Sequence, residues 1–328
     1  MAGAVSDEAH APMLGVQPID EVTAGHPVLA HAIAEVTRQF PSLERHIGIS
    51  FRAFGREFLD DGERVVGMVQ ALTGEGDGFA AALTAYVRLS VEYLKLQRKL
   101  EQSGRYPFSR FADARRAVYD NPEVMDGYYL HGLLLSEIFW QNHYRLLRYF
   151  RDRFVADLPA QGRLAEVGIG HGLFGAEMLE RRAGWALRGI DISRSSLRFA
   201  SRVLDHYGIA PDRYDLVEGD AVALDEPDGA FDAVVCGEVL EHLEHPETAL
   251  AELARVVRPG GRVFITAAIY AANIDHIWLF ESVDQLRLLL DRVGFERVSE
   301  CPIPVSGQEF REGMERVPLS YATVVVRS

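Results

Sequence analysis

Apolar side chains recur every three or four residues through the first half of the chain, which is typical of amphipathic helices. The clearest run lies between residues 79 and 102, where the recurring positions are Phe79, Leu83, Tyr86, Val87, Val91, Leu94 and Leu100. Gly104 follows directly and provides a C-terminal stop for this helix. A second helical run, rich in large side chains, is predicted from Pro122 through Leu147. The pattern predicts an all-helical domain over residues 26–155, preceded by a loose leader over residues 1–25.

The pattern changes at residues 159–162, beyond which apolar runs of strand length alternate with helical segments. The predicted strands are residues 164–167, 186–190, 214–217, 231–236, 262–267, 297–302 and 320–327, and the predicted helices are residues 174–182, 194–207 and 247–257. This alternation is typical of a parallel sheet that carries helices on both faces. An α/β domain is therefore expected over residues 156–328.

Composition narrows the choice of partner and compartment. The 328 residues include 48 acidic and 34 basic side chains, which give a net charge of −14. Such an excess repels nucleic-acid phosphates, so no nucleic-acid partner is expected. Cys236 and Cys301 are expected to be free thiols in a reducing compartment. Because no apolar run approaches the roughly 18 residues of a membrane span and no signal peptide is visible, we expect a cytoplasmic protein without membrane association.

Three alternate glycines follow the first predicted strand of the α/β domain and lead into a helix. Gly168, Gly170 and Gly172 permit positive φ angles and let a ligand approach the backbone, while the helix N-terminus offers unpaired N–H groups. Read alone, the loop is ambiguous, because Gly170, Gly172 and Gly175 also satisfy the fingerprint of dinucleotide-binding folds. The residues around the loop have to show whether it binds a dinucleotide or another ligand.

Those surroundings resemble the class I S-adenosylmethionine-dependent methyltransferases. Five segments occur in that family's order within residues 163–328, namely Glu166-Val-Gly-Ile-Gly-His-Gly172, Gly189-Ile-Asp-Ile-Ser193, Glu218-Gly-Asp-Ala221, Phe231 to Leu243, and Arg258-Pro-Gly-Gly261. The resemblance implies a Rossmann-like domain with a mostly parallel seven-stranded sheet and an antiparallel last hairpin. It also implies S-adenosyl-L-methionine as the cofactor and methyl donor.

The resemblance further implies which residues hold the donor. Asp191 is expected to bind the ribose hydroxyls, and Asp220 is expected to lie against the adenine amino group. The full set of predicted donor-binding residues is Glu166, Gly168, Gly170, Gly172, Asp191, Ile192, Asp220, Ala221 and Glu238.

A cluster of carboxylates and imidazoles follows the fourth and fifth strands of this domain. Glu238, Glu241 and His242 are spaced three and four residues apart, so on one helical turn they would share a face, and His276 would approach from the neighbouring strand end. Two carboxylates and two imidazoles suit a divalent metal ion. The pattern resembles the metal site of small-RNA 2′-O-methyltransferases and, in part, ubiquinone-pathway O-methyltransferases. In the alternative, metal-free interpretation, His242 or His276 acts as a base and Glu241 as an anchor.

The second helical run carries aromatic and histidine side chains that have two interpretations. Such residues most often pack in a core. A helix that directly precedes a methyltransferase domain also commonly closes over the donor, so they are candidates for an acceptor pocket. The candidates are Tyr128, Tyr129, His131, Trp140 and His143.

The sequence therefore predicts a methyltransferase that acts on a small-molecule acceptor of specialised metabolism, with the helical domain as its lid. Two other functions stay open: an NAD-dependent oxidoreductase, and a donor-binding scaffold without turnover. Hydride transfer explains neither Asp220 nor the segment over residues 238–243, whereas a scaffold would share every donor-binding residue. The apolar face of the helix over residues 79–102 also allows a homodimer.

Overall fold

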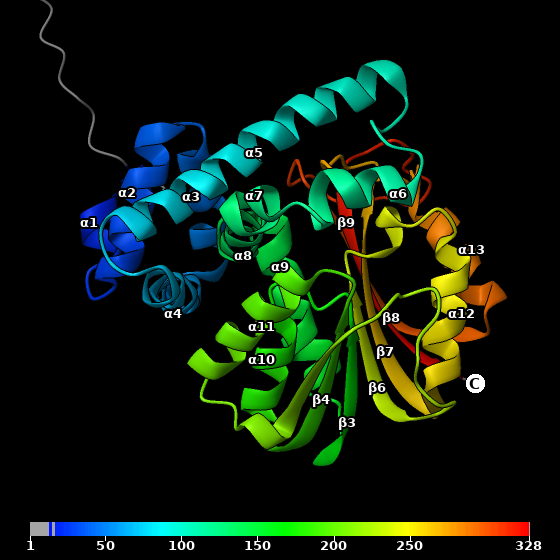
Figure 1. Cartoon of the computed structure of the whole chain (residues 1–328). Coiled ribbons are helices and arrows are strands. Elements are labelled where there is room, and N and C mark those ends of the chain that lie inside the picture. The colour runs from blue at the N-terminus through cyan, green and yellow to red at the C-terminus, as the bar shows by residue number, and fades with distance from the viewer. Residues whose placement is uncertain (1–12, 15–16, 328) are drawn as a thin grey trace, which may run out of the picture.

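The computed structural model describes residues 13–14 and 17–327, and a helical region packs against an α/β domain (Figure 1). The leader predicted for residues 1–25 lies mostly outside the described residues. Its described part forms the short antiparallel strands β1 (Met13–Leu14) and β2 (Gln17–Pro18) and the helix α1 (Ile19–Val22). Among the described residues, no helix is both long enough and apolar enough to cross a membrane.

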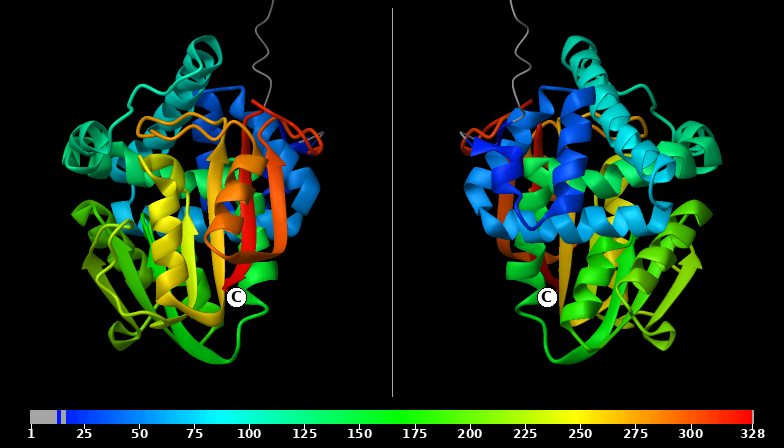
Figure 2. Two further views of the ribbon diagram at one scale, coloured as in Figure 1. Left: turned by 90° about the vertical axis from the view of Figure 1, so that its right-hand side faces the viewer. Right: turned by 90° about the vertical axis from the view of Figure 1, so that its left-hand side faces the viewer.

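The helical region lies over the edge of the sheet at which the parallel strands end (Figures 1 and 2). Its helices are α2 (Pro27–Gln39), α3 (Leu43–Phe54), α4 (Arg56–Thr73), α5 (Asp77–Ser103), α6 (Phe111–Ala114), α7 (Pro122–Val124), α8 (Leu130–Phe139) and α9 (Gln141–Tyr149). Helix α5 is the long helix that the spacing predicts. It ends where Gly104 adopts a left-handed φ of 67° and its N–H donates to the Leu100 carbonyl at 2.7 Å.

The second predicted run is not one continuous helix. Within it, a π-helical turn occurs at η2 (Met125–Tyr129), and two further π-helical turns flank it at η1 (Arg115–Tyr119) and η3 (Phe150–Val155). Between α8 and α9 the backbone of Trp140 is extended. The Trp140 indole donates a hydrogen bond to Ser90 Oγ on α5 at 3.1 Å, and its ring packs beside Tyr93. These contacts to α5 favour the bend, and no local periodicity reveals them.

The α/β domain contains a seven-stranded sheet with the order β5-β4-β3-β6-β7-β9-β8. Its strands are β3 (Gln161–Val167), β4 (Gly184–Asp191), β5 (Tyr214–Glu218), β6 (Phe231–Gly237), β7 (Val257–Ile269), β8 (Phe295–Pro304) and β9 (Leu319–Arg327). Only β9 runs antiparallel to its neighbours, β7 and β8. Helices α10 (Leu173–Arg181) and α11 (Arg194–His206) cover one face, and α12 (Pro246–Val256) and α13 (Val283–Arg292) cover the other (Figure 1). The predicted fold class is confirmed.

The helical region and the sheet share one hydrophobic core. Phe150 and Phe154 from η3 pack against Phe264 of β7, with ring centroids 5.0 and 5.6 Å away, and Phe150 also lies 4.8 Å from Phe174 of α10. All four side chains are buried. Because burying one such ring stabilises a fold by about 1.5–3 kcal/mol, this cluster joins the two parts of the chain far more firmly than a linker would.

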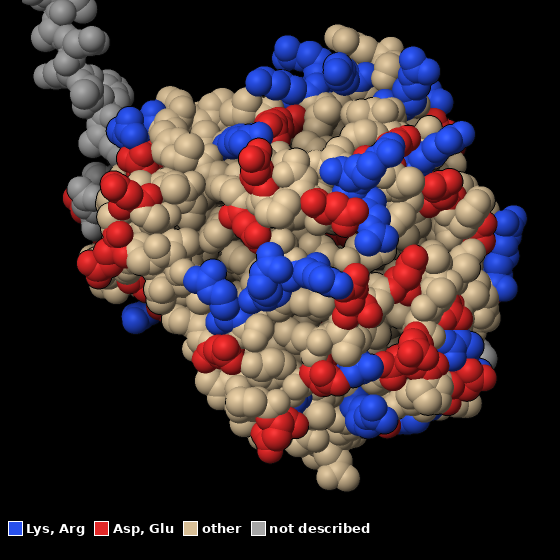
Figure 3. Space-filling model, in the orientation of Figure 1, with Lys and Arg blue, Asp and Glu red and all other residues tan. Residues whose placement is uncertain are grey.

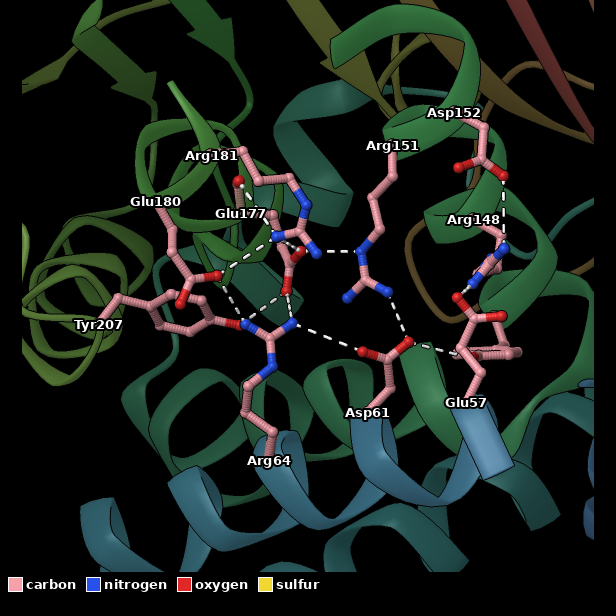
Figure 4. A network of polar contacts seen from close by, with 11 residues as sticks. Glu57, Asp61, Arg64, Arg148, Arg151, Asp152, Glu177, Glu180, Arg181 and Tyr207 are labelled. Atoms are coloured by element: carbon pink, nitrogen blue, oxygen red, sulfur yellow. Dashed lines mark hydrogen bonds and ion pairs between the residues drawn. The ribbon is translucent and has the colours of Figure 1, made fainter. Parts of the chain in front are cut away.

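A buried network of ion pairs crosses the same boundary (Figure 4). Glu177 on α10 is fully buried, and its carboxylate accepts from Arg151 Nε at 2.8 Å and pairs with Arg181 at 2.6 Å and with Arg64 of α4. Arg151 also pairs with Asp61 of α4 at 2.5 Å. Burial by itself raises the pKa of Glu177, but the guanidinium groups outweigh it, above all that of Arg151, and hold this pKa below its usual value. The helical region is thus fixed to the α/β domain by charge as well as by packing.

Charged side chains of both signs are interspersed on the face shown in Figure 3. Elsewhere on the surface of the described residues, exposed charges form ion pairs, as Arg194 does with Glu218 at 2.6 Å and Arg116 does with Asp113 at 2.5 Å. In this view basic side chains gather mainly at the top, over the end of α5. Exposed ion pairs of this kind contribute little to stability. Among the ion pairs described, those of the buried network around Glu177 are therefore the ones that matter for the fold.

Candidate active site

The glycine loop turns the chain from β3 into α10 in a conformation that requires glycine. Gly168, Gly170 and Gly172 have φ angles of 74°, 53° and 77°. A Cβ on Gly168 would lie 2.3 Å from the Val239 side chain, and one on Gly172 would lie 2.8 Å from that of Ala200. Both strain and contact therefore exclude larger residues from this loop.

Asp191 ends β4 and is held by the backbone of the loop. Its Oδ2 accepts a hydrogen bond from Gly170 N at 2.9 Å, and its Oδ1 accepts one from Ser193 N at 2.8 Å. Burial raises the pKa of Asp191, against the effect of these two N–H donors. The two bonds fix the direction of the carboxylate before any ligand binds.

One cavity contains all the predicted donor-binding residues except Gly172, which instead packs against α11. Glu166, Gly168 and Gly170 line one wall of it; Asp191, Ile192, Asp220, Ala221 and Glu238 complete this set. The helical region closes the cavity from above with side chains that include Phe111, Tyr119, Met125 and Tyr129. The cavity is therefore built from both parts of the chain.

A second cavity adjoins the first. It lies among Tyr93 and Leu94 of α5, Trp140, and the segment after β7 that contains His276. The two cavities share one wall, formed by Tyr129, Leu133, His143, Glu238 and His242. A molecule in the second cavity would thus meet a molecule in the first across these five side chains.

The structure brings Tyr129, Trp140 and His143 into this second cavity, but not Tyr128 or His131. Tyr128 donates a hydrogen bond to Glu92 at 2.9 Å, while His131 packs edge-on against Phe199 of α11, with ring centroids 5.0 Å apart. Burial lowers the pKa of His131, in keeping with a neutral packing side chain. Tyr128 and His131 are therefore packing residues and do not line the second cavity.

Three of the four predicted metal ligands form a compact group. Glu241, His242 and His276 each place one ligand atom within 4.8 Å of the others. Glu238 does not share their helical turn, which corrects the prediction: it leaves β6 with a φ of 51°, and only Leu240–His242 form a turn, of 3-10 type (η5). Hydrogen bonds from Glu238 N to Thr266 hold this strained exit from the strand.

Glu241 of this group and the nearby Glu238 each have a carboxyl oxygen without a hydrogen-bond partner among the described residues. These oxygens, Glu238 Oε1 and Glu241 Oε2, are buried. Burial raises the pKa of both groups, and for Glu241 the nearby Glu238 raises it further. Two buried, neighbouring carboxyls with unused oxygens are the electrostatic setting that a cation would relieve.

The two imidazoles of the group are oriented by backbone carbonyls. His276 Nδ1 lies 2.8 Å from the Ala271 carbonyl, so it carries the hydrogen and leaves Nε2 as an acceptor. Burial, and next to it His242, lower the pKa of His276 to about 3, so this ring stays neutral. The two rings meet nearly at right angles with centroids 4.8 Å apart.

Sequence reasoning missed Tyr119 and Asp275, which close this site together with the predicted Tyr129. Tyr119 and Tyr129 donate hydrogen bonds to Asp275 Oδ2 at 2.8 and 2.7 Å, and Asp275 is only 1% exposed. Burial and the charge of Asp275 raise the pKa of both phenols well above the usual value, so they remain donors. Asp275 could have been found from its place beside His276, whereas Tyr119 had no signal in the sequence. Glu137, which also lines the first cavity, was missed for the same reason.

The sheet order, the glycine loop and the acid after β4 are those of a Rossmann-like nucleotide-binding domain. Within this domain, residues 165–265 match the family described as "Methyltransferase domain".

Among curated proteins, the chain is 40% identical over 116 residues to the ubiquinone biosynthesis O-methyltransferase of Ralstonia nicotianae, covering 35% of this chain and 47% of that protein. It is 38% identical over 104 residues to the protein of the same name from Cupriavidus pinatubonensis, covering 32% and 40%. The chain thus spans less than half the length of these relatives. A solved structure of Haemonchus contortus phosphoethanolamine N-methyltransferase 2 shares the fold, with a TM-score of 0.51, 15% identity, and coverage of 68% of this chain and 61% of that one.

Proposed function

We propose that this protein transfers the methyl group of S-adenosylmethionine to a hydroxyl group of a small molecule bound in the second cavity. The observation that carries the proposal is the wall shared by the two cavities. Methyl transfer is an in-line displacement at carbon, so donor and acceptor must meet across one short gap. His143, Glu238 and His242 lie at that meeting point. The O-methyltransferase names of the curated relatives support oxygen as the methylated atom.

The lining of the second cavity indicates the kind of acceptor. Tyr93 and Trp140 present aromatic rings whose centroids are 5.3 Å apart, and Leu94 and Leu133 add aliphatic surface. Asn142, Asn273 and His276 add polar groups to the same lining. The combination favours a flat molecule that has an apolar face and also carries hydroxyl groups. We therefore propose a phenolic or similar hydroxyl compound of specialised metabolism as the acceptor.

A divalent metal ion fits the group formed by Glu241, His242 and His276. The orphaned oxygens of Glu238 and Glu241 and the unprotonated Nε2 of His276 are the donor atoms that such an ion needs. Glu241, His242 and His276 would hold the ion, with Glu238 beside them. When bound, a divalent ion lowers the pKa of a coordinated hydroxyl group and so favours the nucleophilic oxyanion.

The chain's own residues supply enclosure and orientation. Tyr119 and Tyr129, anchored on Asp275, cover the site and exclude water from the reacting groups. Asp275 also lies beside His242, whose Nδ1 is 3.3 Å from its carbonyl oxygen and 3.5 Å from its Oδ1. A second-sphere carboxylate of this kind fixes the orientation of an imidazole.

The proposal is tested by incubating the protein with methyl-labelled S-adenosylmethionine and a panel of phenolic and aliphatic hydroxyl compounds, with and without added divalent ions. A labelled methyl ether as product supports the proposal. A protein that binds S-adenosylhomocysteine but methylates no compound of the panel would favour the scaffold interpretation. A protein that binds NADH in place of S-adenosylhomocysteine would favour an oxidoreductase.

Asp191→Ala is expected to lower the affinity for S-adenosylhomocysteine by roughly ten- to a hundredfold. The substitution removes charge-assisted hydrogen bonds to the ribose, worth about 1.5–3 kcal/mol. Asp220→Ala is expected to weaken binding less, because the adenine also gains from apolar contacts. Calorimetric titration measures both, with the exposed Asp212→Ala as the matched control. Unchanged affinity in a folded Asp191→Ala protein would contradict the assignment of Asp191 to the ribose.

A further inference from the structure

A buried carboxylate from the helical region reaches the glycine loop. Glu137 of α8 is only 7% exposed and lies between His143 of α9 and His171 of the loop. Its Oε1 is 3.5 Å from both His143 Nδ1 and His171 Nε2. Glu137 and both histidines line the first cavity. One carboxylate therefore connects the two parts of the chain inside the proposed donor site.

The neighbouring hydrogen bonds show which nitrogen of each histidine faces Glu137 with a hydrogen. His171 Nδ1 accepts from Leu173 N at 3.2 Å, so the hydrogen of the neutral ring is on Nε2. Ser136 Oγ donates to the Leu133 carbonyl at 2.7 Å, so it accepts from His143 Nδ1 at 3.0 Å. His171 thus directs its Nε2–H toward Oε1 of Glu137, while the Nδ1–H of His143 is shared between Ser136 Oγ and the same Oε1.

The other oxygen of Glu137 is left for a ligand. Oε2 is buried and makes no hydrogen bond within the described part of the chain. Burial by itself would raise the pKa of Glu137, but His143 and His171 outweigh it and lower this pKa to about 2. The group is therefore an anion with one unused oxygen, and its side chain lines the first cavity. A positively charged hydrogen-bond donor is the complement that this oxygen requires.

The position of Glu137 in the cavity indicates which positively charged group of a bound donor it would meet. Asp191 and Asp220 mark the nucleoside end, whereas His143, beside Glu137, belongs to the wall shared with the second cavity. The methyl group that is transferred must face this shared wall. Because that methyl group is bonded to the sulfonium sulfur, the sulfur must also lie near the wall. Two methylene groups join this sulfur to the α-carbon of the donor's amino-acid tail. The primary ammonium group on that carbon therefore lies in the same part of the cavity as Glu137.

We propose that Glu137 binds the α-ammonium group of the donor's amino-acid tail through its free Oε2. The assignment rests on the proposed function and deepens it: the helical region would recognise the donor as well as the acceptor. His143 and His171 act as positioning residues, because they hold Oε1 and so leave Oε2 for the ligand.

The test compares two ligands that differ in this tail. S-adenosylhomocysteine carries the ammonium group, whereas 5′-methylthioadenosine retains the nucleoside and the sulfur but lacks the amino acid. In calorimetric titrations, Glu137→Gln is expected to weaken S-adenosylhomocysteine binding by roughly ten- to a hundredfold and to leave 5′-methylthioadenosine binding unchanged. The control is Glu92→Gln, which removes another carboxylate of the helical region that accepts from Tyr128 and lines neither cavity. This control should bind both ligands as the wild-type protein does.

The possible outcomes separate this assignment from the proposed function. If wild type binds both ligands and Glu137→Gln either leaves both affinities intact or lowers both equally, the assignment of Glu137 is overturned. If wild type binds neither ligand, the proposed function itself fails. Should Glu137→Gln not fold, Glu137→Asp retains the charge at a shorter reach, and the same selective loss for S-adenosylhomocysteine is expected.

Discussion

Replacing Glu241 or His276 with alanine is expected to lower methyl transfer by about a hundredfold or more, while the affinity for S-adenosylhomocysteine stays nearly unchanged. Each substitution removes one of the three side chains that lie within 4.8 Å of one another. The loss of a ligand weakens the hold on a divalent ion, whose role concerns the acceptor and not the nucleoside. Activity should accordingly vanish on chelation and return when one divalent metal is added back.

The measurement combines metal analysis of dialysed protein with transfer assays in the presence and absence of chelator. His245→Ala is the matched control for His276→Ala, because the His245 side chain is 71% exposed and lies outside the group. Metal-free protein that works at full rate would contradict the metal assignment. The histidines would then remain candidates for general bases, and the glutamates would be structural anchors.

Replacing Glu177 with glutamine is expected to lower the free energy of unfolding by about 3–5 kcal/mol. The substitution leaves the guanidinium groups of Arg151, Arg64 and Arg181 at the boundary between the two parts of the chain without their shared anion. Removing one partner from a buried ionic network costs about this much, because the remaining charges stay desolvated. Urea-induced unfolding at neutral pH measures the change.

The neighbouring Glu180 offers a matched control for this experiment. Its side chain is 44% exposed and also pairs with Arg64 and Arg181, so Glu180→Gln should cost less than about 1 kcal/mol. If both variants lost the same free energy of unfolding, the burial of Glu177 would not explain the effect of its substitution.

The same network predicts how stability depends on pH. The pKa of Glu177 is lower in the folded protein than its usual value of 4.5. Its contribution to stability is therefore fully present above pH 4.5 and is lost as the pH falls through the lower, folded-state pKa. In Glu177→Gln this part of the acid destabilisation should be absent, which a series of unfolding curves between pH 3 and pH 6 would show.

The shared core and the buried network also bear on how the site opens. The helices that carry Asp61, Arg64 and Arg151 are fixed to α10, so they are unsuited to swing away as one lid. The segment over residues 104–129 is held differently, through Tyr119 and Tyr129 on Asp275 and through Phe111 N on Glu244 at 2.8 Å. Tyr106 OH also donates to the Ala271 carbonyl at 2.8 Å, and Val118 and Met125 are buried in the shared core. Opening the donor cavity through this segment would therefore have to break packing as well as polar contacts.

Several features of the fold could be predicted because they depend on local patterns. The spacing of apolar residues predicts α5, and the alternation of strands with helices predicts the sheet. The glycine loop could be recognised because a left-handed backbone strongly favours glycine, and all three of its glycines adopt positive φ. Asp191 and Asp220 could be placed because each follows directly on a strand whose position the periodicity had already indicated.

Other features are decided by contacts between residues that are distant in the chain. The bend at Trp140 depends on Ser90, 50 positions away, and the closure of the site depends on Tyr119 reaching Asp275, 156 positions away. Helical spacing predicts that Glu238 shares a turn with Glu241, but the strained exit from β6 leaves Glu238 before that turn, because Thr266 on the neighbouring strand holds its backbone.

By itself, the sequence thus determined the class of fold, the donor loop and the residue types available for chemistry, since propensity, periodicity and positive φ act within a few residues. Only the tertiary structure decided which of those residues meet. It drew Glu137 between His143 and His171, excluded Tyr128 and His131 from both cavities, and set two cavities against one shared wall. The physical reason is that such meetings depend on the packing of whole helices against the sheet, to which every buried side chain contributes.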